Sequence, residues 1–461
     1  MASSRKLRSA DFAERVAARI SPLLPVHSSI LIGLSGGVDS VVLLHLLHKL
    51  SARFSWQLSA LHVHHGISPN ADAWSDFCAE LCARHHIPLH IERVDIAPLR
   101  EHGIEAAARK LRHAAFAGRS CDFVALAHHA DDQVETLLLQ LLRGAGVRGA
   151  SAMPVLSQAK RSQLASRKDS ASLIRPLLHC SRDEILAYAD ANQLHWIEDE
   201  SNADDSYPRN FLRHRVLPLL GERFPAYRRT LARSAQHFSE ASALLDELAQ
   251  LDAGQAIVEE TLDADVLKGL SLPRAKNLLR YFLHGVGAPM PQAVQLDDML
   301  NQLCGARADA VVCIAYGASE VRRYRGKVYV LRALGEFDPD FVLVWHGQAE
   351  LDWPALDARL RFNPTSGVGM SLARLQSSAV TIRLRHGGES MRPGSNAATR
   401  SLKNLLQESD VPPWQRDRLP LLYCGDELVC VPGVAISAAY QAKAGETAVH
   451  VELQGARAGK S

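Results

Sequence analysis

The chain has 461 residues, of which 47% are apolar and 22% charged, an ordinary globular balance in a chain long enough for two or three domains. The formal net charge of +2 does not mark the chain as a nucleic-acid binder, so any surface for nucleic acid must be a local patch. The eight cysteines are scattered and form no CxxC pair, which argues against a disulfide framework or a zinc ribbon.

The N-terminal stretch, residues 1–24, is basic but has no apolar core and carries acidic residues, so it does not read as a signal peptide. The chain also lacks an apolar run of about 18 residues, the length that a membrane-spanning helix needs. We therefore expect a cytoplasmic protein without a membrane partner.

Residues 1–150 alternate between short apolar runs, which predict strands, and segments with helical periodicity. The predicted strands are 29–34, 58–63, 89–94 and 123–127, and the predicted helices are 38–50, 73–85, 104–117 and 133–142. This rhythm predicts an α/β fold with a doubly wound parallel sheet covered by helices on both faces.

The pattern changes after this region. Residues 219–303 are almost wholly helical in pattern, and strand signals return at 311–333. Residues 380–451 mix strand-like runs with one helix near 403–408. The predicted domains are therefore a catalytic domain at 1–217, a small, mainly helical substrate-binding domain at 218–335 and a C-terminal α+β domain at 336–461.

A glycine-rich turn, Ser35-Gly36-Gly37-Val38-Asp39-Ser40, lies between the first predicted strand and its helix. Glycines allow close approach of a phosphate, and the helix N-terminus offers unpaired N–H groups and a positive dipole end. Asp39 would repel phosphate unless a Mg²⁺ ion lay between them. The alternative is a plain tight turn with a capped helix. The full string resembles the PP-loop of the N-type ATP pyrophosphatases, so we predict ATP here, with Asp39 as Mg²⁺ ligand.

Two other phosphate motifs lack their structural context. The near-Walker string at 455–461 is one residue short and has no room for a following helix. The glycines at 144, 146 and 149 follow a predicted helix and not a strand, which argues against a dinucleotide fold.

Further polar stretches fall on the same rim of the predicted sheet, where ligands bind. Strand alternation places His62 and His64 on one face and His65 on the other, which favours packing beside the nucleotide over a metal site. Glu105 and Arg109 lie four residues apart on a predicted helix, and alone they would indicate only a surface ion pair.

Asp132 and Glu135 share one face near the start of the fourth predicted helix. A carboxylate pair there could hold an ammonium group through charge-assisted hydrogen bonds. Acidic residues are also common helix caps, so the spacing alone leaves both interpretations open.

Several strings together resemble the tRNA(Ile)-lysidine synthetase family over nearly the whole chain. They are SGGVDS, HVHHG, GIEAAARKLR, HHADDQVET, LLRGAGVRG, WIEDESNADDSYPRNFLRHRVLPLL (residues 196–220) and LKNLLQESDVPPWQRDRLPLLY. The chain departs from the family in the polar stretch 158–172, which we expect to be an exposed loop.

The resemblance implies a ligase that adenylates the wobble cytidine of a tRNA(Ile) with a CAU anticodon, using ATP and Mg²⁺. L-Lysine then displaces AMP and forms lysidine, which changes codon reading from AUG to AUA. The sequence does not fix the oligomeric state, and a homodimer is one candidate. The rival interpretations are a tRNA thiolase of the same superfamily and a non-catalytic RNA-binding protein.

By the resemblance, specific residues take specific roles. The expected catalytic residues are Asp39, Asp132, Glu135 and Arg109. The expected ATP-binding residues are Ser35, Gly36, Gly37, Val38, Asp39, Ser40 and His62. Lysine is expected at Asp132, Glu135 and Arg209. The tRNA-binding residues follow from local basic charge: residues 209–233 contain seven arginines against one acid, Glu222, and the C-terminal region adds further cations. Solvated helix faces are the alternative, but with a tRNA substrate we expect phosphate contacts at Arg213, Arg215, Arg383, Arg385, Arg392 and Lys403.

Overall fold

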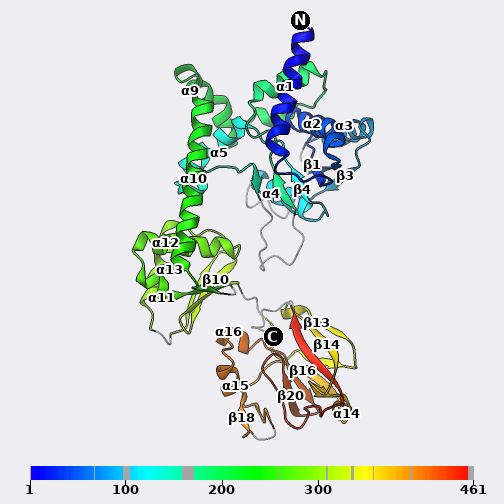
Figure 1. Cartoon of the computed structure of the whole chain (residues 1–461), viewed down its shortest axis with the longest axis vertical. Helices are drawn as coiled ribbons and strands as arrows, with labels where there is room; N and C mark the ends of the chain where they lie inside the picture. The colour runs from blue at the N-terminus through cyan, green and yellow to red at the C-terminus, as the bar shows by residue number, and fades with distance from the viewer. Residues whose placement is uncertain are drawn as a thin grey trace. The chain divides into compact units, whose positions relative to one another are not determined.

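A computed structural model describes residues 2–66, 68–96, 104–157, 171–258, 260–307, 310–333, 337–356, 358–394 and 397–454 (Figure 1). The chain divides into two compact units, Met1–Leu331 and Arg332–Ser461. Most of the stretch 158–172 that we expected to be a loop, and the near-Walker string at 455–461, lie outside the described residues.

The first unit contains a six-stranded sheet with the order β3-β2-β1-β4-β6-β5, in which only β5 runs antiparallel to its neighbour. Its strands are β1 (Ser29–Gly33), β2 (Gln57–His64), β3 (Leu89–Arg93), β4 (Phe123–Ala125), β5 (Leu156–Ser157) and β6 (Ser172–Ile174). The predicted parallel sheet is confirmed. The strand order reverses between β1 and β4, and in such sheets this switch point is where ligands bind.

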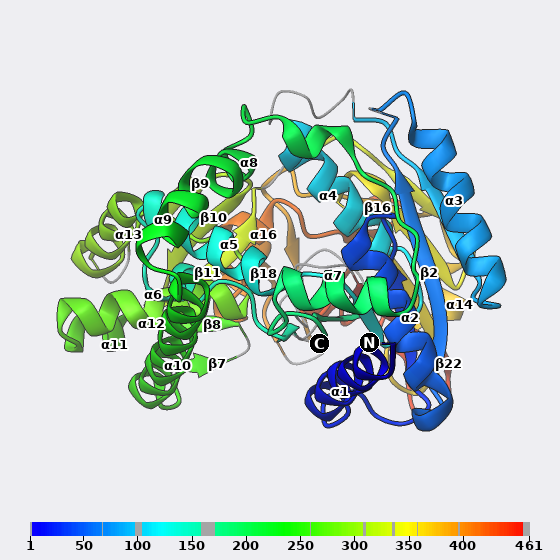
Figure 2. The ribbon, with the colours of Figure 1, turned by 90° about the horizontal axis from the view of Figure 1, so that it is seen from above.

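Helices cover both faces of this sheet, as Figure 2 shows from above. Successive residues of β1 point to opposite faces, so Ile30 and Ile32 pack with α1, α2 and α7, while Leu31 packs with Phe116 of α4. The helices here are α1 (Ala2–Ile20), α2 (Val38–Phe54), α3 (Ala71–Arg84), α4 (Ile104–Ala117), α5 (Ala130–Leu142), α6 (Val147–Ala150) and α7 (Arg182–Ala191).

A helical segment leads from this α/β core to the rest of the first unit. It consists of α8 (Pro208–Phe211), a π-helical turn (Leu212–Val216), α9 (Leu217–Arg223) and α10 (Tyr227–Ala253). Near its start α10 packs on α5 and α6, through Tyr227 and Ala235, and near its end Ala249 joins the core beside α12. Among the described residues, no helix combines the length and the apolar character needed to cross a bilayer.

The second part of this unit packs helices on a five-stranded antiparallel sheet with the order β7-β8-β11-β10-β9. Its elements are β7 (Ile257–Val258), β8 (Thr261–Asp263), α11 (Ala264–Gly269), α12 (Leu272–Gly285), α13 (Ala293–Gly305), β9 (Val312–Tyr316), β10 (Ser319–Tyr324) and β11 (Lys327–Arg332). The strands β7 and β8 lie inside the stretch with helical pattern. They were missed because runs of two and three residues show no periodicity.

The second unit is α+β, as predicted. Two antiparallel sheets have the orders β12-β16-β19-β20-β21 and β13-β14-β22-β15, and β17 pairs with β18. The strands are β12 (Leu343–Trp345), β13 (Glu350–Trp353), β14 (Ala358–Ser366), β15 (Met370–Ser371), β16 (Val380–Arg383), β17 (Ser390–Met391), β18 (Arg400–Ser401), β19 (Leu421–Cys424), β20 (Glu427–Val431), β21 (Ala435–Ile436) and β22 (Thr447–Gln454), and the helices are α14 (Leu372–Leu375), α15 (Leu402–Glu408) and α16 (Pro413–Arg416).

Candidate functional site

The turn after β1 requires glycine for two reasons. Gly36 has a φ of +90°, a backbone conformation that side chains other than glycine's rarely adopt. A Cβ atom there would also lie 2.8 Å from Ile197 Cδ1, and the Gly36 carbonyl accepts a hydrogen bond of 3.0 Å from the Ile197 N–H. The segment around Ile197 therefore holds the turn in place.

The backbone of this turn forms a nest of donors. The N–H groups of Ser35 and Gly36 converge on the hydroxyl oxygen of Ser40, at 3.2 and 3.1 Å, and Ser40 in turn donates to the Gly37 carbonyl at 2.9 Å. Gly37 caps α2 in an extended conformation and has no side chain to satisfy the first N–H groups of the helix. Convergent N–H groups and an open helix start make an anion site.

Asp39 follows in the first turn of α2 and is only partly exposed. Its Oδ2 lies 3.7 Å from Nε2 of His129, while its buried Oδ1 has no hydrogen-bond partner in the described part of the chain. Burial raises the pKa of Asp39, with the charge of His129 opposing and that of Asp132 adding. A buried carboxylate oxygen without a partner, next to an anion nest, suits a cation that bridges carboxylate and phosphate.

The start of α5 stands opposite, after β4. Asp132 accepts a 2.9 Å hydrogen bond from the backbone N–H of His129, so it closes the first turn as a capping box. This bond begins the helix at Ala130, three residues before the predicted start. His129 is almost fully buried, and its Nε2 lies 3.6 Å from Asp132 Oδ2. His129 thus connects the two carboxylates that follow β1 and β4.

Glu135 has no exposed surface, and both of its oxygens are held by guanidinium groups. Arg209 Nε donates to Glu135 Oε2 at 2.6 Å, and Arg213 donates from Nε to Oε1 at 2.7 Å and from Nη2 to Oε2 at 2.9 Å. Arg209 also donates to Asp132 Oδ1 at 2.9 Å. The carboxylates that we predicted to hold lysine are therefore paired with arginines in this structure.

The electrostatics follow from this pairing. Burial alone would raise the pKa of Asp132, but the positive charges of His129 and Arg209, which lie beside it, lower this pKa below its usual value. Burial likewise opposes the charge of Arg209, yet Asp132 and Glu135 raise the pKa of this guanidinium. The helix dipole at the start of α5 stabilises the same ionised carboxylates.

Sequence reasoning assigned no role to Asp131, yet it anchors the other side of the site. Asp131 accepts a 3.1 Å hydrogen bond from the N–H of Arg182, at the start of α7, and pairs with Arg228 of α10. A pocket of about 280 Å³ opens here. Its lining residues are His129, Asp131, Glu135, Arg182, Asp183, Arg213, Leu217, Pro218, Gly221, Tyr227 and Arg228. The pairing of Asp131 carries no sequence signal, because its partners lie 51 and 97 residues away.

Two other predicted residues lie around this centre. His62 is buried at the end of β2, and its Nδ1 lies 2.9 Å from the Leu34 carbonyl, where it supports the turn from behind. Arg109 is exposed on α4, close enough to Arg175 that its charge, after burial, helps to lower the Arg175 pKa to about 10. Arg175 is a buried cation that sequence reasoning missed.

The residues predicted to bind tRNA fall in different settings. Arg213 is committed to Glu135, whereas Arg215 is exposed and donates to Asp205 at 2.7 Å. In the second unit, Arg383 lies over the ring of Tyr423 and Arg385 lies 3.6 Å from Glu389. Arg392 donates to the Ala397 carbonyl at 2.9 Å, and Lys403 is exposed on α15. Their contact with tRNA stays a prediction.

Comparison with known proteins bears on the whole chain. Residues 9–220 match a PP-loop domain, residues 262–329 a TilS substrate binding domain and residues 380–453 a TilS substrate C-terminal domain. A tRNA(Ile)-lysidine synthase from Nitrosomonas europaea is 43% identical over 98% of this chain and 97% of its own length. A tRNA(Ile)-lysidine synthase from Coxiella burnetii is 40% identical over 94% of this chain and 94% of its own length. A U34-tRNA thiolase from Methanococcus maripaludis, a solved structure, is 19% identical, covers 51% of this chain and 80% of its own, and has a TM-score of 0.42. With relatives this similar over nearly its full length, the chain belongs to the tRNA(Ile)-lysidine synthase family.

Proposed function

We propose that this chain ligates L-lysine to the wobble cytidine of a tRNA(Ile) with a CAU anticodon, at the expense of ATP. The observation that carries the proposal is the pairing of two helix starts at the switch point of the sheet. The start of α2 offers donors for phosphate, and the start of α5 offers carboxylates for an amine. Both are needed when one site must first activate a base and then aminate it.

In the first step, O2 of the cytidine attacks the α-phosphorus of ATP and pyrophosphate leaves. The N–H groups of Ser35 and Gly36 and the first turn of α2 stabilise the negative charge that develops on the leaving phosphates. Asp39 would hold Mg²⁺ through its unpartnered Oδ1. Bound there, Mg²⁺ supplies charge neutralisation.

In the second step, the ε-amine of lysine attacks C2 of the cytidine and AMP leaves. The ammonium form of lysine must reach Asp132 or Glu135, and these carboxylates are paired with Arg209 and Arg213. Lysine therefore exchanges with at least one guanidinium contact before it reacts. His129 and Arg209 keep Asp132 ionised, so its carboxylate can hold the ammonium group and take the proton that this group must lose before it attacks. Arg109 of α4 adds positive charge close to His128.

The proposal also divides the chain into three functional parts. Residues 1–217 carry the chemistry, 218–335 bind substrate and 336–461 bind tRNA, a division supported by the matched ranges 9–220, 262–329 and 380–453. The exposed residues Arg215, Arg392 and Lys403, and the partly exposed Arg383, are candidates for phosphate contacts. We place the enzyme in the cytoplasm, where tRNA and free lysine are both present.

The rival chemistry, sulfur transfer, needs a reactive thiolate. Burial raises the pKa of Cys78 to about 12 and that of Cys180 to about 11, which makes both thiols poor nucleophiles at neutral pH. Replacing the cysteines one at a time by alanine should leave the turnover rate unchanged. Loss of activity from a single replacement, in a protein that still folds, would favour the thiolase.

The deciding experiment incubates the purified full chain with ATP, Mg²⁺, L-lysine and the CAU tRNA(Ile) transcript. We expect release of pyrophosphate and, in nucleosides from the treated tRNA, the mass of lysidine in place of one cytidine. A tRNA that is bound but unchanged, with no pyrophosphate released, would favour a non-catalytic RNA-binding protein. A mass gain equal to the exchange of oxygen for sulfur would identify a thiolase.

A further inference from the structure

The arginines between residues 209 and 233 fall into two groups that the sequence does not separate. Those committed to carboxylates are Arg209, Arg213, Arg215 and Arg228. The remaining three, Arg223, Arg229 and Arg233, are exposed and take part in no ion pair or side-chain hydrogen bond with the described residues. The first group is paired with carboxylates of the chain, although Arg215 stays exposed, and the second group is available to a ligand.

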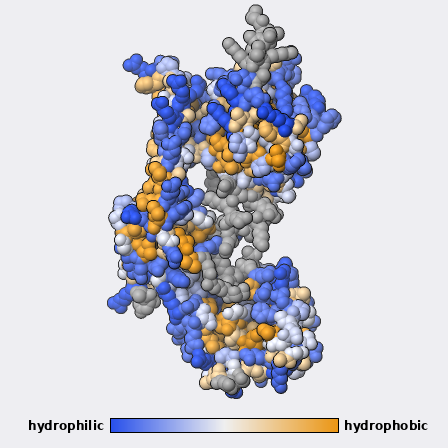
Figure 3. Space-filling view, in the orientation of Figure 1, coloured by the Kyte–Doolittle hydropathy of each residue, from blue (hydrophilic) through white to orange (hydrophobic). Residues whose placement is uncertain are grey.

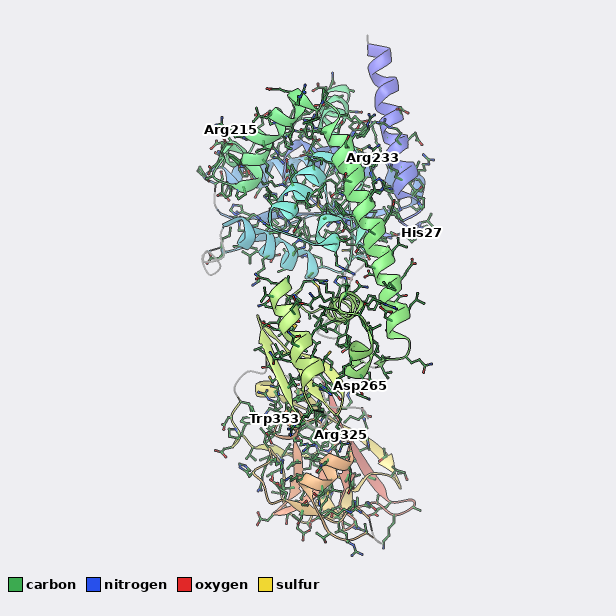
Figure 4. The ribbon with its side chains drawn as sticks, turned by 90° about the vertical axis from the view of Figure 1, so that its left-hand side faces the viewer. His27, Arg215, Arg233, Asp265, Arg325 and Trp353 are labelled. Atoms are coloured by element: carbon green, nitrogen blue, oxygen red, sulfur yellow. The ribbon has the colours of Figure 1, made fainter. Side chains whose placement is uncertain are left out.

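The second group lies on one corner of the first unit. Arg229 and Arg233 are one helical turn apart on α10, on the side opposite to Tyr227 and Ala235, which pack inward on α5 and α6. Arg223 ends α9, directly before α10 begins. Figure 4 faces this side of the molecule and labels Arg233 on α10 and Arg215 beside α9.

The same corner exposes apolar side chains. Phe224 is 60% exposed and follows Arg223, and Leu219 is 66% exposed one turn before Arg223, on the side of α9 away from the buried Leu217. Figure 3 shows hydrophilic residues over the upper part of α10 and paler, more apolar ones at the tip near α9. An exposed aromatic ring among cations suits an unpaired base that is followed by phosphates.

We propose that Arg223, Phe224, Arg229 and Arg233, the α9–α10 corner, bind a single-stranded RNA loop. Phe224 stacks on an unpaired base, and the three arginines contact the phosphates beside it. This inference rests on the proposed function, because that function makes the RNA an anticodon loop. Charge decides between partners: the three arginines have no carboxylate partner among the described residues, and residues 219–233 contain a single acid, Glu222. Asp131, which also lies close to α10, is already paired with Arg228. A polyanion therefore fits the corner better than a protein surface.

The test uses the full chain and two fluorescent RNAs, a hairpin carrying the CAU anticodon loop and a blunt duplex of equal length. Arg229→Gln with Arg233→Gln should weaken hairpin binding and reduce the slope of log K against log salt by roughly one to two. The matched control is Arg19→Gln with Arg84→Gln, two exposed arginines on α1 and α3, which lie away from α10 in Figure 2. The control should bind as the unchanged protein does.

Stacking has its own readout. Phe224→Ala should weaken hairpin binding by about 5- to 100-fold, with an unchanged salt slope and unchanged duplex binding. Phe224→Tyr should restore binding because it keeps the ring. If both the arginine pair and Phe224→Ala bind the hairpin as the control does, the inference is overturned. It is also overturned if the variants change only self-association, since the corner would then be a protein interface.

This outcome is separate from the fate of the proposed function. A protein that forms lysidine while the corner variants keep the unchanged KM for tRNA retains its function and loses this inference. A protein that forms no lysidine but loses hairpin binding through Phe224→Ala loses the function and keeps the RNA surface.

Discussion

The starts of α2 and α5 face each other across the switch point of the sheet, and they differ in how far their charges are satisfied. At the start of α2, Gly37 provides no side-chain cap and Asp39 Oδ1 has no partner among the described residues. At the start of α5, a capping box is closed, and Asp132 and Glu135 are paired with Arg209 and Arg213. One helix start is open to a ligand, and the other is already filled by the chain itself.

The difference teaches how one crevice serves two substrates of opposite charge. Phosphates can enter the α2 side without displacing a protein group other than the Ser40 hydroxyl. A lysine ammonium must compete with guanidinium groups on the α5 side, where an unpaired Glu135 would be a buried charge of high cost. The arginines therefore keep Glu135 stable until a substrate cation replaces them. Each prediction below changes one side and leaves the other intact.

The largest effect is expected from the filled side. Glu135→Gln removes a fully buried charge and leaves Arg209 and Arg213 with Asp132 alone. Breaking a buried pair in this way should lower the free energy of unfolding by about 3–5 kcal/mol. Urea unfolding of the full chain measures it, with Glu14→Gln as control, because Glu14 pairs with Arg53 at the surface and should cost about 0–1 kcal/mol. Equal unfolding midpoints for the two variants would mean that the buried ion pairs of Glu135 do not stabilise the fold.

The open side should lose activity without losing stability. Asp39→Asn removes the expected Mg²⁺ ligand, so pyrophosphate release should fall by about 10²- to 10³-fold. RNA binding should stay within about twofold, since the basic corner is untouched. The fold should gain stability, because burial disfavours the ionised form of Asp39. Asp11→Asn, at an exposed position of α1, is the matched control, and turnover equal to that of the control would remove Asp39 from the mechanism.

The same contrast shows how much the sequence could reveal. The turn at 35–40 follows from local composition, since glycines, a buried strand and an amphipathic helix are adjacent in the chain. The parallel sheet follows likewise from periodicity. The pairing of Glu135 with Arg213 does not, because the partners are 78 residues apart and no local rule joins them.

The roles of single arginines were the hardest to predict. From Arg209 to Arg233 the sequence shows a uniform basic stretch, and Arg213 was predicted to bind tRNA by that criterion. Only the packing of α8 to α10 on α5 separates inward from outward cations, and a π-helical turn at Leu212–Val216 shifts the helical phase between them. The strands β7 and β8 escaped prediction for a related reason, since tertiary pairing and not pattern makes them strands.

A milder effect concerns lysine. Asp132→Asn keeps the shape of the site and a hydrogen-bond acceptor for Arg209 but removes one negative charge. A charge-assisted hydrogen bond contributes about 1.5–3 kcal/mol, so the KM for lysine should rise about tenfold or more, while the KM for ATP changes little. Steady-state pyrophosphate release at varied lysine measures both values. A lysine KM equal to that of the unchanged protein would refute the assignment of Asp132 as an ammonium ligand.

Acidification is the mildest way to separate the two helix starts, because the pKa values of their carboxylates are shifted in opposite directions. Burial raises the pKa of Asp39 above 3.8, so its protonated form stabilises the fold below pH 3.8, and this contribution is lost as the pH rises through the raised pKa. Asp132, despite burial, has a pKa lowered by His129 and Arg209, so its contribution is present above pH 3.8 and is lost only as the pH falls through the lower value.

Asp39 should therefore take up a proton before Asp132 as the pH falls from neutrality. Carbon-13 NMR of labelled aspartate carboxyl groups, assigned with Asp39→Asn and Asp132→Asn, measures the order directly. Added Mg²⁺ and ATP should lower the apparent pKa of Asp39, because a cation favours the ionised carboxylate, and should leave that of Asp132 nearly unchanged. If Asp132 titrated at the higher pH, the α5 side would be the open one and the assignment of phosphate and amine to the two helix starts would have to be reversed.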